Sequence, residues 1–431
     1  MESTASRHTF VHYLFFWGGQ LFSILGSSII GFVIIWWIAK ETLNPITVSI
    51  AFFLGSLPMV IIPPIVGVFI DRWNRKIVIA LADSLQAFIT FLIILFFFTG
   101  IANVWLVISM NIFRGICQAI HFPTVNAIIP IMIPKKYLSR MNAINYLFTG
   151  VIQVIGPIVG ATLLAFFEIE QILWADIFTF FIAIVPLLLI KIPSILSKSE
   201  QTKKVSYFKD FKDGIKILKS VKSFLILIIF ISVINLLNMP FTTQMPLFVL
   251  INHSGGELDF ALVSAFLQIG IVIGAIIALT KKHWKHKELI ILYSVFIGIG
   301  GYLITTIAPT GNFLLMGIGA LIHASMIPIA NTMFLTILQT KIPPETQGRV
   351  FSIVISIAAA VTPLGMIISG PLAVTFGIRL LFIIVLYLQF VSVMVIWFFT
   401  NLKNVIRTES KDESREKPEE VSLRPEQIEL Q

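Results

Sequence analysis

The sequence predicts an all-helical integral membrane protein with twelve transmembrane helices, arranged as two pseudo-symmetric halves of six. Three observations support this fold class. Hydrophobic residues make up 57% and charged residues 12% of the 431 residues, too apolar a composition for a soluble protein to cover with a polar surface. Twelve apolar stretches are long enough to cross a bilayer, and nearly all Lys and Arg residues lie on one side of them.

The individual spans follow from length and apolar composition. A helix needs about 20 predominantly apolar residues to cross the hydrocarbon layer. Helices are expected because the strands of a membrane barrel are shorter and alternate apolar with polar residues. In chain order, the predicted spans are 10–39, 46–70, 77–99, 103–128, 141–167, 172–192, 222–250, 260–280, 289–308, 312–335, 350–376 and 380–400.

The positive charges indicate the orientation of these spans. Of 31 Lys and Arg residues, 28 lie at the termini, in the connections from an even span to the next odd one, or at the span ends that border such a connection. Lys40 and Arg379 lie on the other side, and Arg114 lies inside a span. Because cytoplasmic loops are enriched in Lys and Arg, we expect both termini in the cytoplasm. The net charge of +9 therefore indicates contact with anionic lipid headgroups and no nucleic-acid partner.

The chain divides into four predicted parts. Residues 1–192 form the first six-helix bundle, and residues 222–400 form the second. The linker 193–221 carries seven lysines opposite apolar residues at helical spacing, which predicts an amphipathic helix on the cytoplasmic leaflet. The tail 401–431 is rich in alternating charges and is expected to be disordered.

Polar residues repeat between the two halves. Residues spaced three and four apart share one helix face, and the first and seventh spans carry such sets 215 residues apart: Gln20, Ser23, Ser27 and Asn235, Asn238, Thr242. The fifth and eleventh spans likewise share a Gly-Pro pair, at Gly156 and Gly370. Two halves of like orientation explain this register, and coincidence among small polar residues is the alternative.

These faces predict a hydrated cleft between the halves, because polar residues inside a span usually face a bundle interior or a water-filled cavity. Further candidates for the cleft lie in the fourth, fifth and tenth spans: Asn111, Gln118, His121, Asn145, Gln153 and His323. Hydrogen bonding between helices explains such residues equally well. Both histidines are ambiguous, and His121 also fits an end-of-helix position.

Arg114 needs a counter-charge or a polar cavity, because an arginine at mid-span costs at least about 2.5–3.5 kcal/mol. The acids within the spans are Asp83 and Asp176. At about 1.5 Å per residue, Asp83 lies within reach of Arg114 on the adjacent span, whereas Asp176 lies near the outer end of the sixth span. A low dielectric favours the protonated carboxyl group, so both acids are candidate proton carriers, with a static ion pair as the alternative.

The turn between the second and third spans has the spacing Gly-x-x-x-Asp-Arg-x-x-Arg-Lys, formed by Gly67, Asp71, Arg72, Arg75 and Lys76. This turn resembles the signature loop of the major facilitator superfamily. The resemblance extends over about residues 10–400 and implies the major facilitator fold. It also implies that this loop latches the halves together on the cytoplasmic side, with Arg349 as its docking partner.

Other matches imply the activity. Arg114 resembles the family's fourth-helix arginine, which is implicated in proton coupling, and the fifth span resembles a pattern associated with exporters: Gly150, Gly156, Pro157 and Gly160. This pattern lacks one of the family's earlier glycines. The stretch from His121 to Pro134, together with Asp83 and Asp176, looks most like the macrolide-efflux branch of drug–proton antiporters.

The resemblance implies a monomeric transporter of the plasma membrane that exports an amphipathic or hydrophobic compound in exchange for protons by alternating access. The sequence contains no nucleotide-binding P-loop, no HExxH pair and no paired cysteines. We therefore expect no cofactor, no metal and no enzymatic activity. A transporter of lysophospholipids or of a siderophore is the alternative, and a membrane-embedded receptor or enzyme is a more distant one.

Overall fold

The computed structural model describes residues 6–70, 73–193, 222–280, 284–341 and 344–399. Helices form nearly all of this part, and they are α1 (Arg7–Thr42), α2 (Pro45–Ile70), α3 (Arg75–Phe98), α4 (Val104–Met132), α5 (Lys135–Leu164), α6 (Ile169–Leu189), α8 (Lys222–Leu247), the short π-helix η1 (Phe248–Asn252), α9 (Glu257–Leu279), α10 (Lys287–Ile307), α11 (Phe313–Lys341), α12 (Pro344–Phe376) and α13 (Ile378–Phe399). The predicted linker helix at 193–221 lies outside the described residues except for residue 193, and so does the tail.

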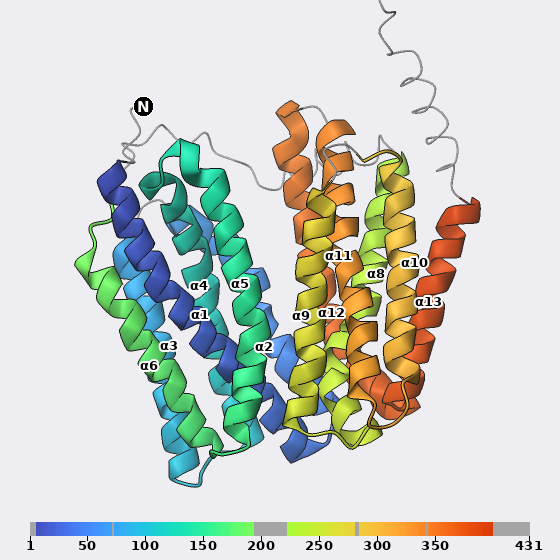
Figure 1. Cartoon of the computed structure of the whole chain (residues 1–431), viewed down its shortest axis with the longest axis horizontal. Helices are drawn as coiled ribbons and strands as arrows, with labels where there is room; N and C mark the ends of the chain where they lie inside the picture. The colour runs from blue at the N-terminus through green and yellow to red at the C-terminus, as the bar shows by residue number, and fades with distance from the viewer. Residues whose placement is uncertain (1–5, 71–72, 194–221, 281–283, 342–343, 400–431) are drawn as a thin grey trace, which may run out of the picture.

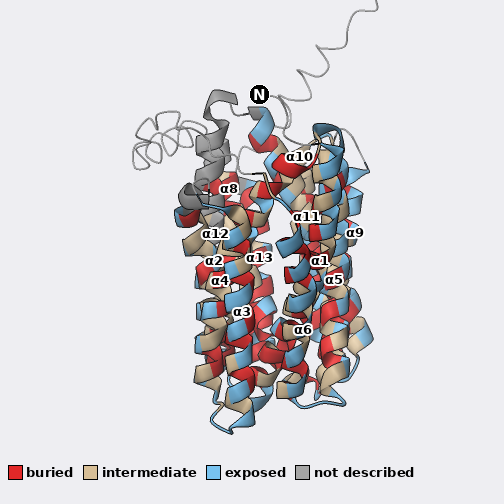
Figure 2. Cartoon of the chain, turned by 90° about the vertical axis from the view of Figure 1, so that its left-hand side faces the viewer, coloured by how far each residue is buried: buried red, intermediate tan, exposed pale blue. Residues whose placement is uncertain are grey.

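The predicted fold class is confirmed. Among the described residues, eleven helices are long and apolar enough to cross a membrane, and α12 contributes a shorter apolar stretch, Ala360–Phe376. Large apolar side chains such as Phe178 and Leu188 are exposed, and Figure 2 shows exposed residues along the outer helix faces. Such a surface suits lipid and not water.

Local sequence explains where several helices begin and turn. Ser6 accepts a hydrogen bond from the backbone of Thr9 at the start of α1, and Asn74 caps α3 in the same way. These side chains satisfy backbone N–H groups that have no partner within the helix. The turn between α12 and α13 passes through Gly377, whose φ of +77° favours glycine.

Figure 1 shows helices α1–α6 gathered in one bundle and α8–α13 in the other. The two bundles lie close together at the end away from the N-terminus and spread apart at the end that carries it. Close contacts between the bundles run through α2 with α12 and through α5 with α9. In the second bundle, glycines allow α9 and α11 to pack closely. A Cβ added at Gly270 or Gly274 of α9 would meet the backbone of α11, so these two helices touch at their backbones.

Candidate substrate and proton site

A cavity of about 220 Å³ lies within the first bundle, between α1, α3, α4 and α5. Eight of the predicted site residues line it: Gln20, Ser23, Ser27, Asp83, Gln118, His121, Asn145 and Gln153. Helical spacing turned these side chains toward one space. Sequence reasoning missed the aromatic part of the wall, which consists of Tyr13, Phe16, Trp17 and Phe122, because apolar side chains carry no distinguishing signal in a membrane helix.

Asp83 is the acidic group of this cavity. Its Oδ1 lies 3.2 Å from His121 Nε2, close enough for an ion pair when the imidazole is protonated. Its Oδ2 accepts a hydrogen bond of 3.4 Å from Gln20 Nε2. Both partners line the cavity, so a carboxyl group and an imidazole face the same space.

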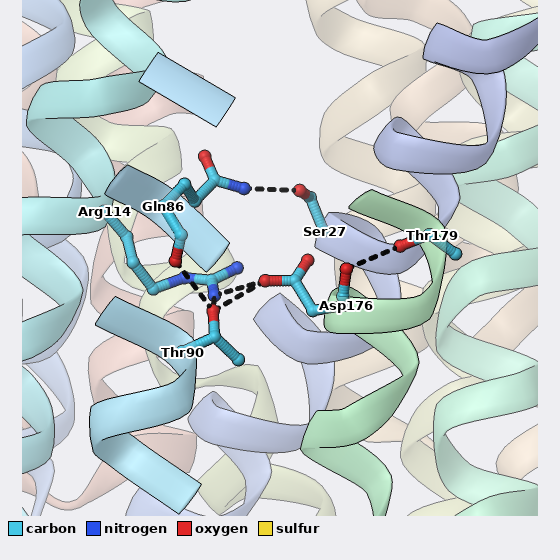
Figure 3. A network of polar contacts seen from close by, with 6 residues as sticks. All are labelled: Ser27, Gln86, Thr90, Arg114, Asp176 and Thr179. Carbon is cyan, nitrogen blue, oxygen red and sulfur yellow. Dashed lines mark hydrogen bonds and ion pairs between the residues drawn. The ribbon is translucent and has the colours of Figure 1, made fainter. Parts of the chain in front are cut away.

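Arg114 pairs with Asp176 and not with Asp83. Arg114 Nη1 lies 2.6 Å from Asp176 Oδ2, and the Thr90 hydroxyl contacts both groups. Counting residues along neighbouring spans pointed to Asp83, but α3 and α6 pack against each other and bring Asp176 to the arginine. Figure 3 shows this network, in which all three side chains are buried.

The buried network adjoins the cavity through α3. Gln86 donates a 2.9 Å hydrogen bond to Ser27 on the cavity wall, while its backbone carbonyl accepts one of 3.0 Å from Thr90 (Figure 3). Asp83, Gln86 and Thr90 therefore lie along one face of α3. Arg114, Thr90 and Asp176 are themselves absent from the cavity lining.

Three of the four predicted residues of the second half line a different cavity, of about 50 Å³, between α8, α10, α11 and α13. Asn235, Asn238 and His323 line it. Gln389 donates a 2.7 Å hydrogen bond to Asn238, and His323 Nδ1 lies 3.0 Å from the Gly298 carbonyl oxygen. Each of these two cavities is lined by residues of one bundle.

Two candidates line neither cavity. Thr242 is exposed, and the amide of Asn111 lies beside Gly55 of α2, 3.3 Å from where a Cβ would be. The next two residues in the chain, Thr243 and Gln244, are instead fully buried.

A polar contact joins the two bundles at the end away from the N-terminus. Ser49 Oγ of α2 lies 2.8 Å from Ser369 Oγ of α12, and Gln244 of α8 donates a 2.7 Å hydrogen bond to Ser49. Thr243 Oγ1 lies 2.6 Å from the same Ser369 hydroxyl. We call these four residues the outer polar contact. No periodic pattern marks them in the sequence, so they could not be predicted.

The predicted cytoplasmic latch is only partly visible. Asp71 and Arg72 lie outside the described residues, and for Gly67 on α2 and Arg349 on α12 only the helical backbone is described. Arg75 is the first residue of α3. Lys76 Nζ donates to the carbonyl oxygens of Leu188 (2.6 Å) and Ile190 (2.8 Å), so it holds the C-terminal end of α6 within its own bundle.

The glycines of the fifth span serve helix packing. A Cβ at Gly156 would meet Ser28 of α1, and one at Gly160 would press on Phe32. Pro157 lies inside the same helix. Gly150 faces the other bundle, where an added Cβ would lie 3.0 Å from Val272 of α9.

No metal site accompanies these cavities: the described part of the chain contains no group of three or more His, Cys, Asp or Glu side chains arranged to hold a metal ion.

Known proteins resemble this chain over most of its length. Macrolide efflux protein A of Streptococcus pyogenes is 25% identical over 363 residues, covering 84% of this chain and 89% of that protein. The multidrug efflux pump Tap of Mycolicibacterium fortuitum is 21% identical, covering 83% and 88%. The crystal structure of a bacterial homologue of the iron transporter ferroportin, in its inward-facing state, has a TM-score of 0.68 at 14% identity, covering 89% and 98%.

The family is shown by a match to its sequence profile. The profile of the Major Facilitator Superfamily matches residues 16–363, which is most of the chain and spans both bundles. With its many apolar membrane-crossing helices and its two-bundle architecture, this chain belongs to the Major Facilitator Superfamily of membrane transporters.

Proposed function

We propose that this transporter exports amphipathic or hydrophobic compounds, drug- or macrolide-like, in exchange for protons. The observation that carries the proposal is the pairing of Asp83 with His121 in a largely apolar cavity. An acid and a histidine at a binding wall can take up and release a proton as the cavity changes its access. The similarity to macrolide efflux protein A and to Tap supports export of such compounds.

Alternating access between the two bundles is the proposed mechanism. The outer polar contact closes one end, while the bundles spread apart at the end of the N-terminus (Figure 1). With both termini in the cytoplasm of a plasma-membrane protein, as the charge distribution favours, this arrangement is an inward-facing state. In the opposite state, the loop containing Asp71 and Arg72 would latch onto the start of α12 near Arg349.

Three charged groups are the proposed proton-coupling residues: Asp83, Asp176 and Arg114. Asp83 faces the cavity and is the group that meets water and substrate. Asp176 and Arg114 form the buried pair that contacts Thr90, about two helical turns along α3 from Asp83, and a change in one charge of the pair alters the energy of the other. Each charge that crosses the membrane contributes about 2.3 kcal/mol per 100 mV, which is sufficient to drive export against a gradient.

The charge of the cavity bears on the alternative substrates. A lysophospholipid carries a phosphate group, and anionic groups in proteins are usually bound by Arg or Lys. The residues that line the two cavities include neither, so the cavity chemistry favours neutral or cationic compounds over a lysophospholipid. A siderophore remains the second candidate within the same fold.

Uptake into everted membrane vesicles tests the proposed function. A panel of amphipathic bases, neutral macrocycles, lysophospholipids and siderophores is offered with an imposed proton gradient, with and without a proton ionophore. We expect accumulation of amphipathic compounds that collapses when the ionophore is added. Accumulation that is insensitive to the ionophore contradicts proton exchange, and accumulation of lipids or siderophores alone contradicts the substrate class.

A further inference from the structure

The wall around Asp83 contains a buried hydrogen-bond acceptor that has no partner among the described residues. Gln20 is only 4% exposed, and its Nε2 donates to Asp83 Oδ2. The other amide atom, Gln20 Oε1, is buried and has no hydrogen-bond partner among the described residues. A buried acceptor without a partner is costly. This oxygen therefore marks a position where a donor from a bound molecule would be stabilised.

Among the described residues, no Lys or Arg pairs with Asp83. The residues that line the cavity include no Lys and no Arg. Arg114, the arginine of the neighbouring helix, is paired with Asp176 at 2.6 Å. Within this cavity, His121 alone can supply a positive charge, and only when its imidazole is protonated. A neutral His121 leaves the wall with one net negative charge.

Aromatic rings complete the same wall. Tyr13, Phe16 and Trp17 of α1 line the cavity together with Phe122 of α4. Trp17 Nε1 donates a 2.9 Å hydrogen bond to Asn145, which fixes the indole ring at the cavity edge. The faces of such rings attract cations, most strongly where water is excluded. Carboxylate, amide oxygen and rings all favour the same kind of ligand.

We propose that this wall is a binding site for the protonated amine of a transported compound, with Asp83 as its counter-charge and Gln20 Oε1 accepting an N–H bond. This inference rests on the proposed function and narrows its substrate class to amphipathic bases. The cavity volume of about 220 Å³ is below the roughly 300–1,000 Å³ of pockets that enclose a drug-sized ligand. The site therefore holds the amine-bearing end, and the apolar remainder extends beyond it.

Equilibrium binding of a matched pair of probes tests the amine site. Propranolol carries a secondary ammonium group, and N-acetylpropranolol has the same rings but no charge. Both are measured by dialysis against the purified full-length protein in phosphatidylcholine nanodiscs, with empty nanodiscs subtracted to remove partitioning into lipid. We expect the wild-type protein to bind propranolol at least about tenfold more tightly than N-acetylpropranolol, because only propranolol can form a charge-assisted hydrogen bond.

Variants then assign that preference to Asp83. Asp83→Asn keeps the shape and removes the charge, so the preference should fall to about threefold or less. Glu41→Gln makes the same chemical change at an exposed position and should retain the full preference. Gln20→Leu keeps the acid and removes the unpartnered oxygen, so it should weaken propranolol binding alone, and it serves if Asp83→Asn does not fold.

Two binding results overturn the amine site: equal affinities of the wild-type protein for both probes, or a preference that Asp83→Asn retains. Binding is measured without a gradient, so a failure of proton-driven export in vesicles leaves a positive result standing. Conversely, proton-driven export of neutral compounds with no preference for amines refutes the amine site but supports the proposed export function.

Discussion

Arg114 and Asp176 lie where an isolated charge would be most costly. Both side chains are buried, and a Thr90 hydroxyl contacts both. Such a pair is weak evidence for stability, because desolvation offsets the Coulomb attraction. The presence of a buried ion pair in a membrane-spanning bundle therefore favours a role beyond packing.

Arg114→Ala should abolish proton-driven export and should also destabilise the protein, because removing one partner of a buried ion pair costs about 3–5 kcal/mol. Thermal unfolding of the purified protein measures the second effect, and ionophore-sensitive export measures the first. The double variant Arg114→Met/Asp176→Leu separates them. It leaves no unpaired charge and should regain most of the stability, but it should not regain export. Active, pH-dependent export by either variant contradicts the role of the pair in coupling.

From the sequence we could predict that Arg114 needs a counter-charge, but not which acid supplies it. A mid-span arginine requires a counter-charge, and the two acids within the spans narrowed the choice to Asp83 and Asp176. Which of them Arg114 meets depends on how α3, α4 and α6 are rotated against one another. Packing sets those rotations, and no single helix encodes them.

The sequence predicted which helices are present more accurately than where each helix begins and ends. The structure extends α4 to Met132 and begins α5 at Lys135, whereas apolar composition alone gave 128 and 141. Helices continue into the headgroup layer, where polar residues are tolerated, so hydropathy marks the hydrocarbon core and not the helix end. The π-helix η1 after α8 likewise carries no signal in composition.

The close packing of α9 on α11 predicts how a glycine substitution on α9 changes the stability of the protein. Gly274→Ala should lower the thermal stability and the yield of folded protein, because its Cβ would overlap the backbone at Ser325 and force the helices apart. Gly300→Ala on α10 is the matched control, since nothing lies within 4 Å of its added Cβ. The control substitution should leave the stability unchanged or raise it by up to about 1 kcal/mol, because alanine has a higher helix propensity than glycine. Equal melting temperatures for the two variants would show that backbone contact does not limit this helix pair.

For the whole molecule, the repeat of polar residues predicted two related bundles, but not how they touch. Ser49, Thr243, Gln244 and Ser369 are ordinary residues in apolar helices, and only their meeting across the bundles makes them a contact. A backbone approach accompanies the contact, because a Cβ on Gly370 would meet the Pro45 carbonyl and Ile46. These are contacts between residues far apart in the sequence, so no local pattern reveals them.

Cross-linking the outer polar contact tests whether it must open during transport. The native Cys117 is first replaced by Ala, since it is the one cysteine of the chain, and cysteines are then placed at Ser49 and Ser369, whose hydroxyls lie 2.8 Å apart. Oxidation should tie the two bundles together and stop export, and a reductant should restore it. The matched control pairs Thr243→Cys with Ser369→Cys, whose hydroxyls lie at a similar distance of 2.6 Å but belong to the same bundle. Because that bond spans no moving interface, oxidation of the control should leave most of its export intact. Export that continues in the oxidised Ser49–Ser369 pair would mean that these bundles do not separate at this end, and alternating access in the proposed form would fail.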